Sequence, residues 1–127
     1  MNGGNIVSSD AAVRVASSSS DNYKDVSASF TMNGGEIDAA WDGVFVQQSN
    51  AAWDKLSFTM NGGTIESDLN PVRLYGPAPS SYVNGAECVD IKLNGGTLEY
   101  TGTEAREWLV DGILRIGGGA NFLATPV

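Results

Sequence analysis

The sequence predicts an all-β fold, a short parallel β-helix in which a repeated segment stacks into a solenoid of about four to five coils. Three observations predict it: an Asn-Gly-Gly segment recurs along the chain, apolar and polar residues alternate around each copy, and glycine is abundant. Alternation with period two is typical of half-buried strands. The 16 glycines among 127 residues disfavour helices, because each glycine costs about 1 kcal/mol in a helix interior.

The repeat can be followed along the whole chain. The apolar residue that precedes the Asn, or its counterpart in a degenerate fifth copy, lies at positions 1, 32, 60, 93 and 116. A second alternating segment follows in three copies, at 13–15, 44–46 and 72–74. We therefore expect one domain, 1–127, with coils at about 1–29, 30–57, 58–90 and 91–113 and a C-terminal cap at 114–127.

The Asn-Gly-Gly segment suits a sharp corner between strands, because Gly and Asn tolerate positive φ at the least cost. Coils stacked about 4.8 Å apart place equivalent residues above one another. A carboxamide in such a stack can donate to one neighbour and accept from the other. The sequence therefore predicts an Asn ladder made of Asn2, Asn33, Asn61 and Asn94.

An antiparallel β-sandwich is the alternative fold, because Asn-Gly is also a strong hairpin signal. Two features favour the solenoid instead. Each of the first four copies has a second Gly after Asn-Gly, and the apolar positions of these copies recur every 28 to 33 residues.

The repeat resembles that of the right-handed parallel β-helix superfamily, which includes pectate lyases, phage tailspikes and repeat-rich bacterial surface proteins. Asn ladders at coil corners are a recurring feature of that group. The resemblance covers nearly the whole chain and rests on the repeat spacing and the Asn-Gly-Gly corner. It implies right-handed coils, and it includes no catalytic motif.

The composition excludes several classes of function. A net charge of −8 and a pI near 4.2 argue against nucleic acid, which is bound largely through Lys and Arg. His is absent, which removes the Ser-His-Asp triad and most transition-metal sites. No apolar stretch reaches the roughly 20 residues that span a bilayer, and the first residues do not resemble a signal peptide. Cys88 is the only cysteine, so it forms no internal disulfide, and its role stays open.

Carboxylate chemistry is the enzymatic option that remains. Alignment of the coils brings Asp38, Glu66 and Glu99 to one face. Paired carboxylates there could hydrolyse a glycoside or hold Ca²⁺. Acidic residues that are simply solvated, and that limit aggregation, are the plainer explanation. We therefore predict no catalytic residues, no metal site and no cofactor.

The resemblance to polysaccharide lyases implies a basic residue that abstracts a proton. Arg14 and Arg73 are the candidates, because they occupy matching outward positions on the first and third coils. Phe45 lies between them on the second coil, and cation–π packing of the three side chains explains the arrangement better than catalysis does.

Four aromatic residues are candidates for glycan binding, because exposed aromatic rings stack on sugar rings. Trp41 falls in a turn and should be partly exposed, and the others lie in or beside the longer loops. The competing explanation is that some of these rings fold back over the coil edge. The predicted binding residues are Trp41, Trp53, Tyr75 and Tyr82.

The sequence therefore predicts a non-enzymatic structural or adhesive module at a cell surface or on a virion, with polysaccharide as its partner. The alternative is a carbohydrate-active enzyme, a polysaccharide lyase or glycoside hydrolase, or a fragment of one. The ends of a short solenoid expose unpaired strand edges. We therefore also expect self-association, or membership of a longer chain, through these ends.

Overall fold

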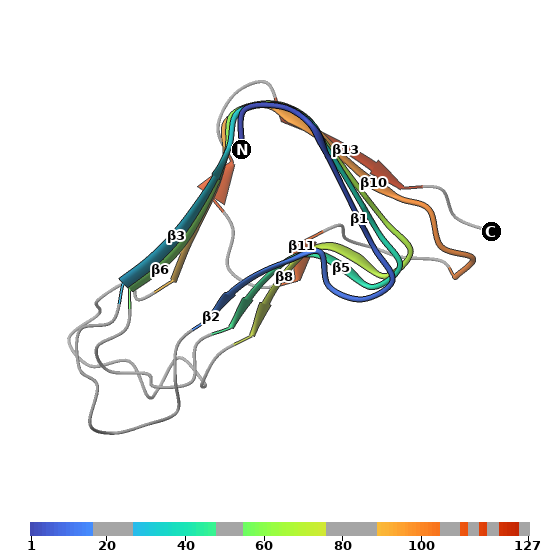
Figure 1. Ribbon diagram of the computed structural model, residues 1–127, viewed down its shortest axis with the longest axis horizontal. Coiled ribbons are helices and arrows are strands. Elements are labelled where there is room, and N and C mark those ends of the chain that lie inside the picture. The colour runs from blue at the N-terminus through green and yellow to red at the C-terminus, as the bar shows by residue number, and fades with distance from the viewer. Residues whose placement is uncertain are drawn as a thin grey trace.

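The computed structural model describes residues 1–16, 27–47, 55–75, 89–104, 110–111, 115–116 and 120–124. Within these ranges the fold is all-β and contains no helix. The strands form three parallel sheets, which appear in Figure 1 as three sides around a common interior. Each sheet takes every third strand of the chain.

The first sheet is, in spatial order, β1 (Asn5–Ser8), β4 (Glu36–Ala39), β7 (Thr64–Ser67), β10 (Gly96–Tyr100) and β13 (Ala120–Ala124). The second sheet is β2 (Val13–Ala16), β5 (Asp42–Gln47), β8 (Asn70–Tyr75) and β11 (Val110–Asp111). The third sheet is β3 (Ser27–Met32), β6 (Lys55–Met60), β9 (Val89–Leu93) and β12 (Arg115–Ile116). We call each successive set of three strands, one from each sheet, a repeat.

The register between repeats follows the alignment that the sequence predicts. In the first sheet Ile6 pairs with Ile37, which pairs with Ile65. In the second sheet Val13, Val44 and Val72 are in register, and in the third sheet Phe30, Phe58 and Ile91 are in register. The predicted alignment of the copies is therefore confirmed.

The antiparallel β-sandwich alternative is wrong. Every strand pairing within the described ranges is parallel. The physical reason is the position of the Asn-Gly-Gly segment, which links a strand of the third sheet to a strand of the first sheet, as between β3 and β4. It therefore turns a corner between sheets and does not join two neighbours in one sheet.

The C-terminal region differs from the cap expected at 114–127. Its two described segments, β12 and β13, pair in parallel with β9 and β10. Phe122 is in register with Leu98, so the apolar position of the first sheet continues into a fifth strand. These segments extend the sheets and do not lie across them.

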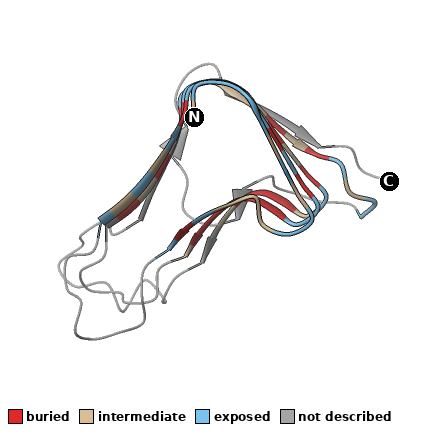
Figure 2. Ribbon diagram, viewed as in Figure 1, coloured by how far each residue is buried: buried red, intermediate tan, exposed pale blue. Residues whose placement is uncertain are grey.

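The core is a single cluster of buried side chains that come from all three sheets, and Figure 2 marks buried residues in red along the strands. In β4, Ile37 and Ala39 are buried while Glu36 and Asp38 are exposed, which is the expected alternation of a sheet with one solvated face. Each large apolar side chain buried in this way contributes about 1.5–3 kcal/mol. The largest fully buried side chains are Tyr100, Phe58, Met32, Ile37, Leu56, Met60, Ile65, Ile91, Leu93, Leu98 and Val44.

The two glycines of a corner between repeats are both needed, for reasons that differ in part. Gly63 has φ +92°, a backbone conformation that glycine adopts most readily. Gly62 has no positive φ, but a Cβ there would lie 2.7 Å from the backbone oxygen of Asn33 in the preceding repeat. The first glycine is therefore required by the close approach of neighbouring repeats. The second is required by the turn and by the same close approach, because a Cβ on Gly63 would lie 2.7 Å from the backbone oxygen of Gly35.

Candidate functional site

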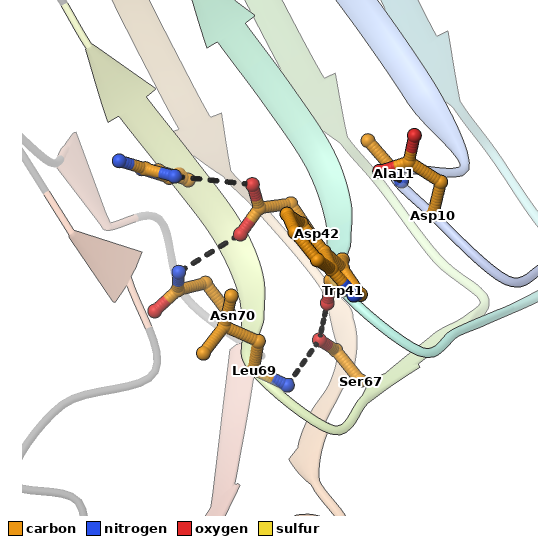
Figure 3. A network of polar contacts seen from close by, with 8 residues as sticks. Asp10, Ala11, Trp41, Asp42, Ser67, Leu69 and Asn70 are labelled. Carbon is orange, nitrogen blue, oxygen red and sulfur yellow. Dashed lines mark hydrogen bonds and ion pairs between the residues drawn. The ribbon is translucent and has the colours of Figure 1, made fainter.

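The most exposed aromatic side chain in the described ranges belongs to Trp41, which lies in the turn between β4 and β5. Its side chain is 58% exposed. Its backbone oxygen accepts a hydrogen bond from the Oγ of Ser67, which also accepts one from the backbone N–H of Leu69 at 3.0 Å (Figure 3). The turn that carries Trp41 is thus fixed to the equivalent turn of the next repeat. We call residues 40–42 the Trp41 corner.

The residue after Trp41 also holds the corner in place. Asp42 is buried, and its Oδ1 accepts a hydrogen bond from Asn70 Nδ2 at 2.8 Å (Figure 3). Its Oδ2 lies 3.5 Å from Arg73 Nη1. Both carboxylate oxygens therefore have partners, as a buried charge requires.

A polar group also lies on the other side of the Trp41 corner. Asp10 occupies the equivalent turn of the preceding repeat, and its side chain is exposed. Its Oδ1 accepts a hydrogen bond from the backbone N–H of Ala11 at 2.8 Å, which fixes the carboxylate beside the corner (Figure 3). The exposed ring of Trp41 and the exposed carboxylate of Asp10 thus lie on equivalent turns of adjacent repeats.

The two arginines considered as bases pack against an aromatic ring. The Cζ of Arg14 lies 5.2 Å from the centre of the Phe45 ring, and that of Arg73 lies 5.1 Å from it on the neighbouring strand. Phe45 is only 8% exposed, although it lies between the inward-facing Val44 and Val46 and faces outward. The predicted cation–π packing is confirmed, and such contacts contribute about 0.5–2 kcal/mol each.

The acidic residues predicted to share a face form a row across three strands of the first sheet. Asp38 is in register with Glu66, and Glu66 with Glu99. Partial desolvation raises the pKa of Glu66, and the neighbouring carboxylates Glu99, Asp38 and Glu36 raise it further. We call Asp38, Glu66 and Glu99 the acidic row. Within the described ranges, no group of three or more His, Cys, Asp or Glu side chains is arranged to hold a metal ion.

The four corner asparagines are linked by their side chains. Nδ2 of Asn33 donates to Oδ1 of Asn2 at 2.8 Å, Nδ2 of Asn61 to Oδ1 of Asn33 at 2.8 Å, and Nδ2 of Asn94 to Oδ1 of Asn61 at 2.9 Å. The backbone repeats the pattern, as the N–H of Asn61 donates to the oxygen of Met32 at 2.7 Å. These bonds tie each corner to the one before it.

The remaining candidates for sugar binding are not brought together with Trp41 by the described structure. Trp53 and Tyr82 lie outside the described residues, as does Cys88. Tyr75 is the last residue of β8, and its backbone is in register with Gln47. Its side chain is not among those that the structure describes.

Sequence reasoning missed the Asp42–Asn70 pair. A signal was present, because the two residues are separated by the same 28 positions as Met32 and Met60, and each follows the turn residue of its repeat. Two polar residues at an equivalent place in adjacent repeats of a stack are expected to meet.

Comparison with known proteins adds no family to this picture. No protein-family model matches the chain, and no curated protein or solved structure is similar enough to count as a match. In the part of the chain that the structure describes, no helix is long and apolar enough to cross a membrane.

Proposed function

We propose that the chain is a right-handed parallel β-helix of the superfamily that it resembles, and that it serves as a non-enzymatic structural and adhesive module outside a cell or on a virion. Three parallel sheets with matched register and a hydrogen-bonded stack of corner asparagines support the β-helix. The handedness comes from the resemblance. In this role the stacked repeats form a rigid support, and the Trp41 corner binds glycans.

The exposed Trp41 ring carries the proposal. An indole left in water forgoes the free energy that its burial would supply, and Trp is enriched at interfaces, where its ring packs on a partner and its N–H stays available for a hydrogen bond. The bonds of Ser67 and Asp42 hold the corner in place before a ligand arrives, which lowers the entropic cost of binding. The carboxylate of Asp10, on the equivalent turn of the preceding repeat, supplies a hydrogen-bond acceptor for sugar hydroxyl groups.

Affinity electrophoresis tests the proposal. The wild type runs through gels that contain a panel of bacterial and plant polysaccharides, beside Trp41→Ala and a control, Val7→Ala, which truncates an apolar side chain that is 77% exposed. At least one polysaccharide should retard the wild type and the control. Loss of the stacked ring should weaken binding by about tenfold. Unchanged mobility across the whole panel, or equal retardation of all three proteins, would contradict the proposal.

A carbohydrate-active enzyme is a second candidate, favoured by the acidic row. Adjacent strands hold carboxylates about 5 Å apart, a separation that retaining glycosidases use, and the raised pKa of Glu66 is the direction that a general acid needs. The row lies on the solvated face of one sheet, however. A glycosidase would need these carboxylates to converge on a bound substrate. Cleavage of a polysaccharide by the wild type but not by Glu66→Gln would favour the enzyme.

A further inference from the structure

Charged side chains are divided among the sheets by sign. The first sheet and the turns after its strands carry acidic side chains that are exposed or half-buried, namely Asp10, Glu36, Asp38, Glu66, Asp68, Glu99 and Glu104. Within the described ranges, these strands and turns contain no Lys or Arg. The basic residues whose backbone is described lie on the second and third sheets, and these are Arg14, Lys55, Arg73, Lys92 and Arg115. The first sheet and its turns therefore produce a negative potential at their surface.

The Trp41 corner lies within this acidic part of the surface. Asp38 is exposed on β4, the strand that leads into the corner. Asp68 is exposed in the turn of the next repeat, where its backbone N–H donates to the oxygen of Ala39 at 3.1 Å. Thr101 Oγ1 donates to Asp68 Oδ1 at 2.7 Å, which holds that carboxylate in place. The two carboxylates therefore belong to the repeat that carries Trp41 and to the next one, about 4.8 Å away along the stack.

The Trp41 ring is itself suited to a positively charged partner. Trp is the aromatic side chain that attracts a cation most strongly, because the face of its π-system is negative. The Phe45 ring already packs against Arg14 and Arg73, whereas in the described part of the chain no Lys or Arg packs on Trp41, whose side chain is 58% exposed. The exposed indole and the carboxylates around it thus favour the same kind of ligand group, a cation.

We propose that the glycan bound at the Trp41 corner carries protonated amino groups, as a polymer of glucosamine with free amines does. This inference rests on the proposed glycan binding and adds the chemical class of the ligand. The sugar stacks on the indole, and the ammonium group that it carries is attracted by the ring face and by the carboxylates of Asp38 and Asp68. The same carboxylates repel polysaccharides that carry uronate or sulfate groups.

Isothermal titration calorimetry of the full chain with three β-linked hexamers tests this preference. The hexamers consist of glucosamine, which is cationic at mildly acidic pH, of N-acetylglucosamine, which is neutral, and of glucuronic acid, which is anionic. At an ionic strength of about 0.01 M, where the Debye length is about 30 Å, the glucosamine hexamer should bind about tenfold more tightly than the neutral one. The anionic hexamer should bind most weakly.

Salt separates the attraction between charges from the stacking on the ring. At an ionic strength of about 1 M, where the Debye length is about 3 Å, the preference for the glucosamine hexamer should largely disappear. Stacking of an uncharged sugar depends little on salt, so Trp41→Ala should still weaken binding of the neutral hexamer under this condition.

Two double variants separate the carboxylates of the corner from the net charge of the chain. Asp38→Asn combined with Asp68→Asn should weaken binding of the glucosamine hexamer by about fourfold at low ionic strength. The second of these substitutions keeps the Oδ1 acceptor for Thr101, so the turn retains its hydrogen bond. Ser29→Lys combined with Thr31→Lys is the matched control, because it changes the net charge by the same amount at exposed positions of the third sheet. The control should change the affinity much less.

The outcomes distinguish this inference from the glycan binding on which it rests. A wild type that the polysaccharide panel retards, but that binds the glucosamine hexamer no more tightly than the other two, overturns the inference and leaves the proposed function standing. Binding of the glucosamine hexamer that Trp41→Ala leaves unchanged, or that both double variants weaken equally, also overturns it, because the cause is then general attraction to a chain of net charge −8. Absence of any retardation in the panel contradicts the proposed function itself.

Discussion

Glu66 lies at the centre of the acidic row, with Asp38 on one neighbouring strand and Glu99 on the other. Partial desolvation and these carboxylates raise the pKa of Glu66 in the folded chain. A group with a raised pKa binds its proton more tightly when folded than when unfolded. Its favourable contribution to stability is therefore present below the unfolded pKa, about 4.3 for Glu, and is lost as the pH rises through the folded pKa.

Glu66→Gln should accordingly raise the melting temperature by a small amount at neutral pH, because the neutral amide removes the repulsion between Glu66 and its acidic neighbours. The advantage should disappear as the pH falls below the unfolded pKa, where the wild-type carboxyl is protonated. Thermal unfolding at several pH values measures both effects. Glu104→Gln is the control, since it removes an exposed carboxylate outside the acidic row. A lower melting temperature at neutral pH, or an advantage that persists in acid, would contradict this explanation.

At the scale of the single residue, the sequence predicted neighbours where side chains share an equivalent place in adjacent repeats, but not contacts that involve the backbone of another repeat. The cation–π contacts of Phe45 could be predicted because Arg14 and Arg73 share its place in adjacent repeats. The role of the first corner glycine could not, because it depends on a backbone oxygen of another repeat, which no local pattern reveals. The contacts of Asp42 with Asn70 and Arg73 were also missed, although the 28-residue spacing of Asp42 and Asn70 was a signal for the first of them.

The corner is the structural element that repeats with least variation, and its Asn ladder can be tested by one substitution. Asn61 donates to Asn33 and accepts from Asn94. Asn61→Asp keeps the acceptor but loses the donor at neutral pH and places a carboxylate beside the Oδ1 of Asn33. The free energy of unfolding should fall by about 0.5–1.5 kcal/mol.

Acid should restore most of this loss, because a protonated carboxyl can donate again. In linkage terms the pKa of the new carboxyl is raised in the folded chain, so the penalty is present above that pKa and disappears below it. Urea unfolding of dilute protein at neutral and acidic pH measures the change. Asn2→Asp is the control, since Asn2 donates to no described residue and should show almost no change. An equal loss in both variants would mean that the ladder bonds do not account for the effect.

For the whole molecule, the repeat predicted the register of three sheets because four copies share the same corner, which fixes the apolar positions on either side. The prediction was weakest where the corner degenerates. The fifth copy has Gly117 in place of Asn, so the sequence indicated a cap where β13 extends the first sheet. The predicted function stays a prediction, because of the four proposed sugar-binding side chains only Trp41 lies in the described structure.

Methyl-labelled nuclear Overhauser spectroscopy tests the stacking of the repeats most directly. Parallel strands in register place Ile6 beside Ile37, and Ile37 beside Ile65, about 4.8 Å apart in the backbone, whereas Ile6 and Ile65 are separated by about twice that distance. We predict strong cross-peaks between the methyl groups of the two adjacent pairs and only a weak one, or none, between Ile6 and Ile65. Absence of both adjacent cross-peaks would contradict the stacked arrangement on which the proposed β-helix depends.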